Sequence, residues 1–210
     1  MNQAFQAVGT IAVIGAGRVG RGIAYATALG GFRTVLEDIL PGTLRSAQGD
    51  IRALLDASVQ RGEVTRANAE AAFTRIEYAS SIEDAVRKAD FVIEAVPDEI
   101  ESKLEIFSLL DRISRPNTIL ASSTFSLRIT DITDVTHCAE RCVGMRFVLP
   151  VETMRDLEIV RAVETDDDTL RTAVRVGERL GKPVRIVVEV LEKAVRENAF
   201  PANQGSGPDV

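Results

Sequence analysis

A glycine-rich turn near the start of the chain carries the clearest chemistry in the sequence. Gly15, Gly17 and Gly20 form the pattern G-x-G-x-x-G directly after an apolar run at residues 10–14. In such a turn the second glycine lets the backbone approach a diphosphate, and the third lets the following helix pack closely on its strand. The unpaired N–H groups that begin this helix would bind the phosphates. The predicted phosphate-binding residues are Gly15, Gly17, Arg18, Val19 and Gly20.

An acid follows at the place where the ribose of a bound dinucleotide is expected. Asp38 comes directly after the second apolar run, close to the spacing of about 20 residues that such sites use. A carboxylate there would bind the ribose hydroxyls and repel a 2′-phosphate, and the next residue is Ile39 rather than an arginine. The sequence therefore predicts NAD, and not NADP, as the cofactor. The alternative is a structural turn with a solvated acid.

Short apolar runs alternate with amphipathic stretches along the chain. Strands are expected at residues 10–14, 34–36, 91–93, 118–121, 142–145, 157–160 and 183–188. Helices are expected at residues 19–29, 41–60, 67–73, 81–89, 99–114 and 166–180. This alternation predicts an α/β fold of the Rossmann type, a doubly wound and mostly parallel sheet with helices on both faces. We expect one NAD-binding domain over residues 1–199 and a disordered tail over residues 200–210.

Composition and charge exclude several classes of protein. The chain has 210 residues and a net charge of -6 at pH 7, which disfavours a general nucleic-acid binder. No apolar run approaches 18 residues, so no membrane-spanning helix is expected. Two cysteines cannot form a disulfide framework, which predicts a cytoplasmic protein. His137, Cys138 and Cys142 lack a second ligand pair, so no metal site is expected.

Four linked segments carry a resemblance to a known family. They read VIGAGRVGRGIAYATALGGFRTVLEDI, ADFVIEAVPDEIESKLEIF, ILASSTFSLRITDI and GMRFVLPVETMRDLEIV. Over residues 8–188 the chain resembles the NAD-binding, N-terminal domain of the 3-hydroxyacyl-CoA dehydrogenases, which are oxidoreductases of fatty acid metabolism. The resemblance adds further residues to the expected cofactor site, namely Ala95, Val96, Lys103 and Ser123. Lys103 has two other interpretations, a replacement acid–base residue and a solvated lysine on a helix face.

The catalytic residues that the resemblance implies are only partly present. The family moves a proton with a His–Glu pair, but Arg146 stands in place of the histidine, whereas Glu158 matches the glutamate. Phe125 stands in place of the family's substrate serine, and Ser123 in place of the asparagine that precedes it. Residues 189–196 replace the later family segment that carries a second asparagine. Arginine cannot be deprotonated in a protein, so Arg146 cannot serve as the base. It could polarise a ketone, bind an anion or pair with Glu158.

These residues are compatible with two functions, one enzymatic and one not. The first is an NAD-dependent oxidoreductase that acts on the CH–OH group of a hydroxyacyl-type substrate with weak or altered catalysis. The second is a non-catalytic NAD-binding sensor or partner module that another chain completes, since the family's helical C-terminal domain is not expected here. The resemblance points to acyl-CoA as the small-molecule substrate and allows a homo-oligomer.

Overall fold

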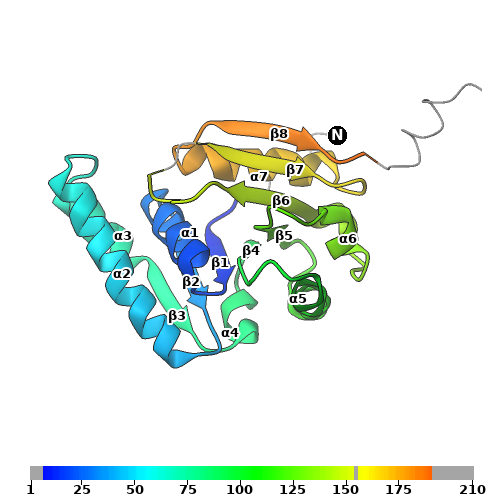
Figure 1. The fold of residues 1–210 in the computed structure, drawn as a ribbon, viewed down its shortest axis with the longest axis horizontal. Helices are drawn as coiled ribbons and strands as arrows, with labels where there is room; N and C mark the ends of the chain where they lie inside the picture. The colour runs from blue at the N-terminus through cyan, green and yellow to red at the C-terminus, as the bar shows by residue number, and fades with distance from the viewer. Residues whose placement is uncertain (1–6, 154–155, 191–210) are drawn as a thin grey trace, which may run out of the picture.

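One eight-stranded sheet organises the computed structural model, which describes residues 7–153 and 156–190 (Figure 1). Its strands are β1 (Thr10–Ile14), β2 (Arg33–Glu37), β3 (Ile76–Ala79), β4 (Phe91–Glu94), β5 (Ile119–Ser122), β6 (Cys142–Phe147), β7 (Leu157–Arg161) and β8 (Val184–Val188). The predicted tail at residues 200–210 and the end of the predicted domain at residue 199 lie outside the described residues.

The strand order places the two halves of the sheet on either side of β1. The order is β3-β2-β1-β4-β5-β6-β7-β8, and all pairs from β3 to β6 are parallel. Only β7 runs antiparallel to β6, and β8 is parallel to β7. The chain therefore turns to one side after β1 and returns to the other at β4. Parallel sheets bind ligands in the crevice at the carboxyl ends of the strands where this reversal occurs.

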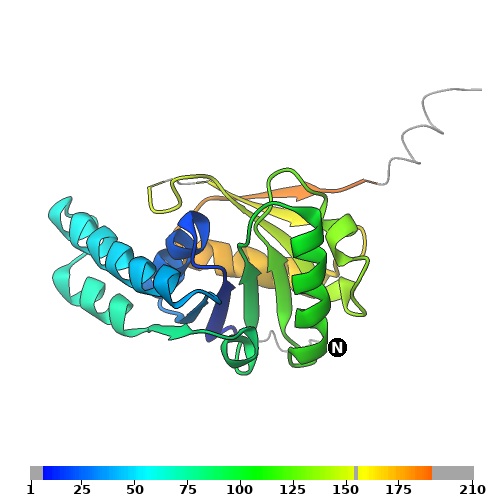
Figure 2. The same ribbon diagram turned by 60° about the horizontal axis from the view of Figure 1, so that its bottom comes forward.

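Helices cover both faces of the sheet, as the alternating pattern predicted. They are α1 (Arg18–Leu29), α2 (Pro41–Gln60), α3 (Arg66–Thr74), α4 (Ile82–Val86), α5 (Ile100–Ile113), α6 (Ile129–Thr133) and α7 (Asp167–Arg179). Apolar residues of α1, α2, α3 and α7 share one core with the sheet, and those of α4, α5 and α6 share a second core on the other face. Figures 1 and 2 show α2 and α3 side by side, projecting from the body of the fold.

Local sequence signals explain where several elements begin and end. The hydroxyl of Ser81 accepts a hydrogen bond from the N–H of Asp84 and caps α4, and Thr65 caps α3 in the same way. Gly30 caps the end of α1, and Gly31, with φ of 83°, turns the chain towards β2. Two elements, β3 and α6, were not predicted, because each is very short and has little periodicity of its own.

Within residues 7–153 and 156–190, no helix is both long and apolar enough to cross a membrane.

Candidate functional site

A cavity of about 840 Å³ opens at the point where the sheet reverses direction. It collects residues from the ends of β1, β2, β4 and β5 and from the first part of α4. Most of the predicted cofactor residues line it, namely Gly15, Gly17, Arg18, Val19, Asp38, Ala95, Val96 and Ser123. The fold thus brings together segments that are far apart in the sequence.

The glycine turn has the geometry that close approach of a diphosphate requires. Gly15 has φ of 96°, a conformation that side chains other than hydrogen disfavour. A Cβ atom on Gly20 would overlap the carbonyl oxygen of Gly15, so only glycine lets α1 lie this close to β1. A Cβ atom on Gly17 would meet no atom within 4 Å. Gly17 therefore borders open space at the start of α1, where the N–H groups of the helix can bind phosphate oxygens.

Asp38 lies at the rim of the same cavity and is held by backbone donors. Its carboxylate accepts hydrogen bonds from the N–H of Ala16, at 3.0 Å, and from the N–H of Leu40, at 2.9 Å. The contact with Ala16 joins the acid to the glycine turn. Ile39 beside it is 79% exposed. The structure therefore places a negative charge where the sequence predicted the ribose-binding acid.

Ser123 supplies an observation that favours a ligand in this cavity. Its hydroxyl oxygen is buried and has no hydrogen-bond partner among the described residues. Its backbone N–H donates to the carbonyl oxygen of Glu94, which fixes the residue at the end of β5. Buried hydroxyl groups are nearly always hydrogen-bonded, so a polar group of a bound cofactor would satisfy this one. Together with the glycine turn, it shows that the residues present fit a dinucleotide.

The position of Lys103 corrects one of the sequence interpretations. It is fully buried, and its Nζ lies 2.7 Å from Oε1 of Glu94 and 3.8 Å from Asp98. The solvated helix-face interpretation is therefore wrong. Lys103 is not among the residues that line the cavity, but its Nζ contacts Glu94 and the carbonyl oxygen of Val96, so it supports the cavity wall. Lys103 is buried because it lies on the face of α5 that packs against the sheet.

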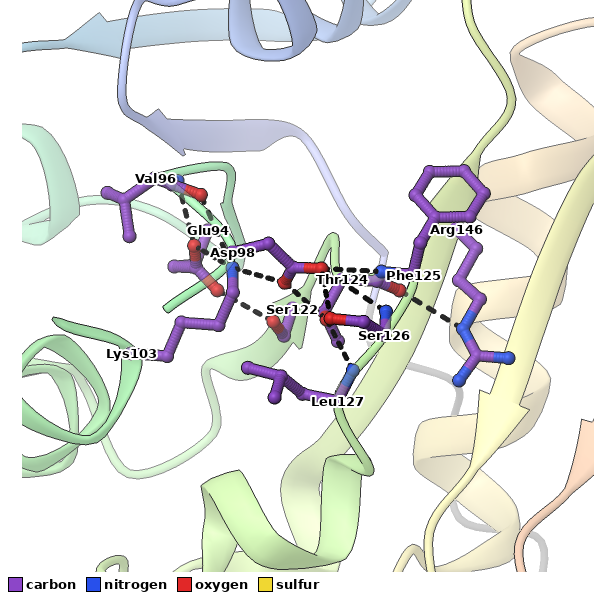
Figure 3. A network of polar contacts seen from close by, with 10 residues as sticks. All are labelled: Glu94, Val96, Asp98, Lys103, Ser122, Thr124, Phe125, Ser126, Leu127 and Arg146. Carbon is purple, nitrogen blue, oxygen red and sulfur yellow. Dashed lines mark hydrogen bonds and ion pairs between the residues drawn. The ribbon is translucent and has the colours of Figure 1, made fainter. Parts of the chain in front are cut away.

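Two acids that were not singled out in the sequence organise the loop after β5 (Figure 3). Glu94 accepts hydrogen bonds from Lys103, from the hydroxyl of Ser122 at 2.6 Å and from the N–H of Val96 at 2.8 Å. Asp98 accepts from the hydroxyls of Thr124 and Ser126 and from two backbone N–H groups. Burial opposes the charge of Asp98, but the hydrogen bonds from Thr124 and Ser126 hold its pKa below the usual value.

A third acid, Glu37, was also missed, and like Asp98 it lines the cavity. Glu37 is the last residue of β2 and is only 4% exposed. Burial, and then the charge of Asp38, raises its pKa to about 7. A glutamate at the carboxyl end of a buried strand, directly before the predicted ribose acid, is the signal that could have pointed to it.

Arg146 and Glu158 are brought together as an ion pair. They lie opposite each other in the antiparallel pairing of β6 and β7, with Nη1 of Arg146 3.8 Å from Oε2 of Glu158. Each side chain is 19% exposed. Nε of Arg146 also donates to the carbonyl oxygen of Thr124 at 3.1 Å (Figure 3). Glu158 forms a second ion pair with Arg185. Neither Arg146 nor Glu158 lines the cavity.

The single histidine lies outside the cavity. Nδ1 of His137 is 2.9 Å from the carboxylate of Asp111, and the histidine side chain is 96% exposed. Cys138 and Cys142 are both buried and reduced. In the part of the chain that the structure describes, no group of three or more His, Cys, Asp or Glu side chains is placed to hold a metal ion.

Comparison with known proteins agrees with this geometry. The family model described as "3-hydroxyacyl-CoA dehydrogenase, NAD binding domain" matches residues 10–190. The chain belongs to this family. The resemblance stated from the sequence motifs is therefore confirmed, and so is NAD as the cofactor of the family.

Curated relatives and solved structures of the family align over nearly the whole chain. A probable 3-hydroxybutyryl-CoA dehydrogenase of Bacillus subtilis strain 168 is 35% identical over 91% of this chain and 63% of the relative. A 3-hydroxybutyryl-CoA dehydrogenase of Bradyrhizobium diazoefficiens is 34% identical over 94% of this chain and 70% of the relative. Among solved structures, (S)-3-hydroxybutyryl-CoA dehydrogenase from Ralstonia eutropha superposes with a TM-score of 0.84 at 32% identity, over 88% of this chain and 65% of that one.

These comparisons also confirm the predicted fold class. The 3-hydroxybutyryl-CoA dehydrogenase structure from Escherichia coli K12 gives a TM-score of 0.83 at 32% identity, covering 87% of this chain and 38% of that chain. The chain thus spans less than two thirds of the length of several proteins that it matches, including the Bacillus subtilis relative.

Proposed function

We propose that this chain is an NAD-dependent oxidoreductase domain of the hydroxyacyl-CoA type in which proton transfer is weak. The observation that carries the proposal is the cavity in which the glycine turn, Asp38 and the unsatisfied hydroxyl of Ser123 meet. Bound NAD supplies the hydride acceptor for a CH–OH group. The open space beside Gly17 would receive the diphosphate, and Asp38 would bind the ribose hydroxyls.

The substrate class follows from the relatives. Several of the matched proteins are 3-hydroxybutyryl-CoA or 3-hydroxyacyl-CoA dehydrogenases by name, so we propose an acyl-CoA thioester as the substrate class. We further propose a cytoplasmic location and self-association into a homo-oligomer.

Arg146 and Glu158 decide how much catalysis remains under this proposal. A histidine near neutral pH can accept and donate a proton, but an arginine stays protonated. The guanidinium of Arg146 is engaged by Glu158 and by the carbonyl oxygen of Thr124. Arg146 would therefore hold the loop after β5 in place, and could polarise a substrate ketone only after giving up these contacts. This favours a second candidate function, an NAD-binding sensor or partner module without catalysis of its own.

Reduction of acetoacetyl-CoA by NADH is expected to be about 10²–10⁴ times slower than with a family member that has the histidine. That is the rate factor that general acid–base catalysis contributes. The measurement is the fall in NADH absorbance, with such a relative assayed in parallel. Arg146→His should recover part of the missing rate, whereas Arg146→Lys, which keeps the positive charge and restores no imidazole, should not. Turnover by the unaltered chain at the relative's rate would contradict the assignment of weak proton transfer.

Asp38→Ala is expected to weaken NAD binding by about 10- to 150-fold, the effect of losing hydrogen bonds to a charged group. Isothermal titration calorimetry measures the affinity, with Asp131→Ala on α6 as a matched control far from the cavity. The ratio of NADP to NAD affinity should rise at the same time, because the repulsion of the 2′-phosphate is removed. If NAD affinity is unchanged in the variant, Asp38 does not bind the ribose. If both affinities fall equally, its role is limited to holding the turn.

A further inference from the structure

Glu37 is a buried acid in the lining of the proposed cofactor cavity, and it has no cationic partner among the described residues. The residue ends β2, is 4% exposed and lines the cavity beside Gly15 and Asp38. Within residues 7–153 and 156–190, no ion pair involves Glu37. Burying an ionised carboxylate without a partner is costly, so such a group takes up a proton instead.

Comparison with Glu94 shows that this lack of a cation is specific to Glu37. Glu37 and Glu94 are both in register with Ile14, one on each side of β1 in the parallel sheet. Residues in register on parallel strands point to the same face, so the two carboxyl groups occupy equivalent places at the carboxyl ends of their strands. Glu94 is paired with Lys103 and receives two further hydrogen bonds. Lys103 thus balances the charge of Glu94, whereas Glu37 can lose its charge only by taking up a proton.

The groups that face Glu37 from neighbouring elements favour its neutral form. Burial has the largest effect, and the charge of Asp38 adds to it, as does that of Glu83 on α4. The backbone N–H of Gly15 acts in the opposite direction, and the resulting pKa of Glu37 is about 7. Arg18 is the basic residue among those that line the cavity. A bound diphosphate would attract Arg18 and place more negative charge next to Gly15.

We propose that Glu37 binds the adenosine half of NAD as a neutral carboxylic acid, so that NAD binding takes up a proton near neutral pH. This inference rests on the proposed NAD site. The neutral group can donate its O–H to a ribose oxygen or an adenine nitrogen, and its carbonyl oxygen can accept in return. The diphosphate repels the ionised form, and the cofactor excludes water from it, so both effects favour the protonated form in the complex.

The consequence is a cofactor affinity that falls as pH rises. Above the pKa of the free protein's Glu37, each further pH unit should lower the apparent NAD affinity by up to about tenfold, because a proton must be taken up first. Below that pKa the affinity should be nearly independent of pH.

Calorimetric titration of NAD at pH 7–8, in buffers with different ionisation enthalpies, measures the proton uptake directly. The unaltered protein should take up about half a proton to one proton per NAD bound. Glu37→Gln keeps the shape and a donor group, and should bind NAD with no proton uptake and with an affinity that does not change between pH 6 and pH 9. Glu77→Gln, an exposed acid on the neighbouring β3, is the matched control and should behave like the unaltered protein.

ADP-ribose provides a second measurement that needs no variant. It keeps the adenosine and the diphosphate and lacks nicotinamide, and neither phosphate titrates near pH 7. It should therefore produce the same proton uptake as NAD. NAD binding without proton uptake by the unaltered protein, or uptake that persists in Glu37→Gln, would overturn the role of Glu37 and leave the NAD site standing. An unaltered protein that binds neither NAD nor ADP-ribose would overturn both proposals.

Discussion

Lys103→Met is expected to lower the free energy of unfolding by about 3–5 kcal/mol, the cost of removing one partner of a buried ion pair. Lys103 and Glu94 are both fully buried, with 2.7 Å between Nζ and Oε1. Methionine fills much of the volume of the lysine side chain, so the loss would come from the unpaired charge of Glu94 and not from a cavity. Unfolding in urea, followed by circular dichroism, measures the effect.

The double variant Lys103→Met/Glu94→Gln separates charge from packing. A glutamine at position 94 can still accept a hydrogen bond from Ser122 or from the N–H of Val96, and it carries no charge. Most of the lost stability should therefore return. Lys88→Met, at an exposed lysine before β4, is the surface control and should change stability by less than about 0.5 kcal/mol. If Lys103→Met lowers the free energy of unfolding by less than about 1 kcal/mol, the Lys103–Glu94 pair does not support the cavity wall.

Gly20→Ala and Gly17→Ala are expected to have different effects although they are three residues apart in one turn. A Cβ atom on Gly20 would overlap the backbone oxygen of Gly15, so α1 would have to move away from β1. We expect a loss of about 3 kcal/mol in stability, at the upper end of the usual cost of overpacking, and no measurable NAD binding. A Cβ atom on Gly17 meets nothing, so Gly17→Ala should fold as the unaltered protein does.

The expected defect of Gly17→Ala is in cofactor binding alone. Its methyl group would enter the space that the diphosphate needs, and NAD affinity should fall by about 10- to 100-fold at unchanged stability. Gly49→Ala in α2 is the matched control, because its Cβ atom also meets nothing and the site lies on an exposed helix surface. It should stabilise the chain by about 0.5–1 kcal/mol and leave NAD binding unchanged. Equal NAD affinity in Gly17→Ala and the unaltered protein would contradict the placement of the diphosphate.

Local sequence signals were sufficient for much of the fold and for the part of the site that is local in the chain. The apolar run before the glycine turn, the caps at Ser81 and Thr65 and the stop at Gly30 all act within a few residues. The glycine turn itself needs only β1 and α1, and Asp38 is held by the N–H groups of Ala16 and Leu40. Such features depend on backbone geometry over one or two turns, which the amino-acid sequence expresses directly.

Taken alone, the amino-acid sequence determined that this chain forms a doubly wound sheet, and it predicted a dinucleotide-binding turn and, through the family resemblance, an arginine in place of the family's histidine. The pairing of the buried charges, by contrast, became visible only in the folded chain. Lys103 meets Glu94 because α5 packs over the end of β4, and Arg146 meets Glu158 because β7 runs antiparallel to β6. In the part of the chain that the structure describes, no cation pairs with Glu37. The physical reason is that a buried charge depends on partners distant in the chain, which local residue patterns do not encode.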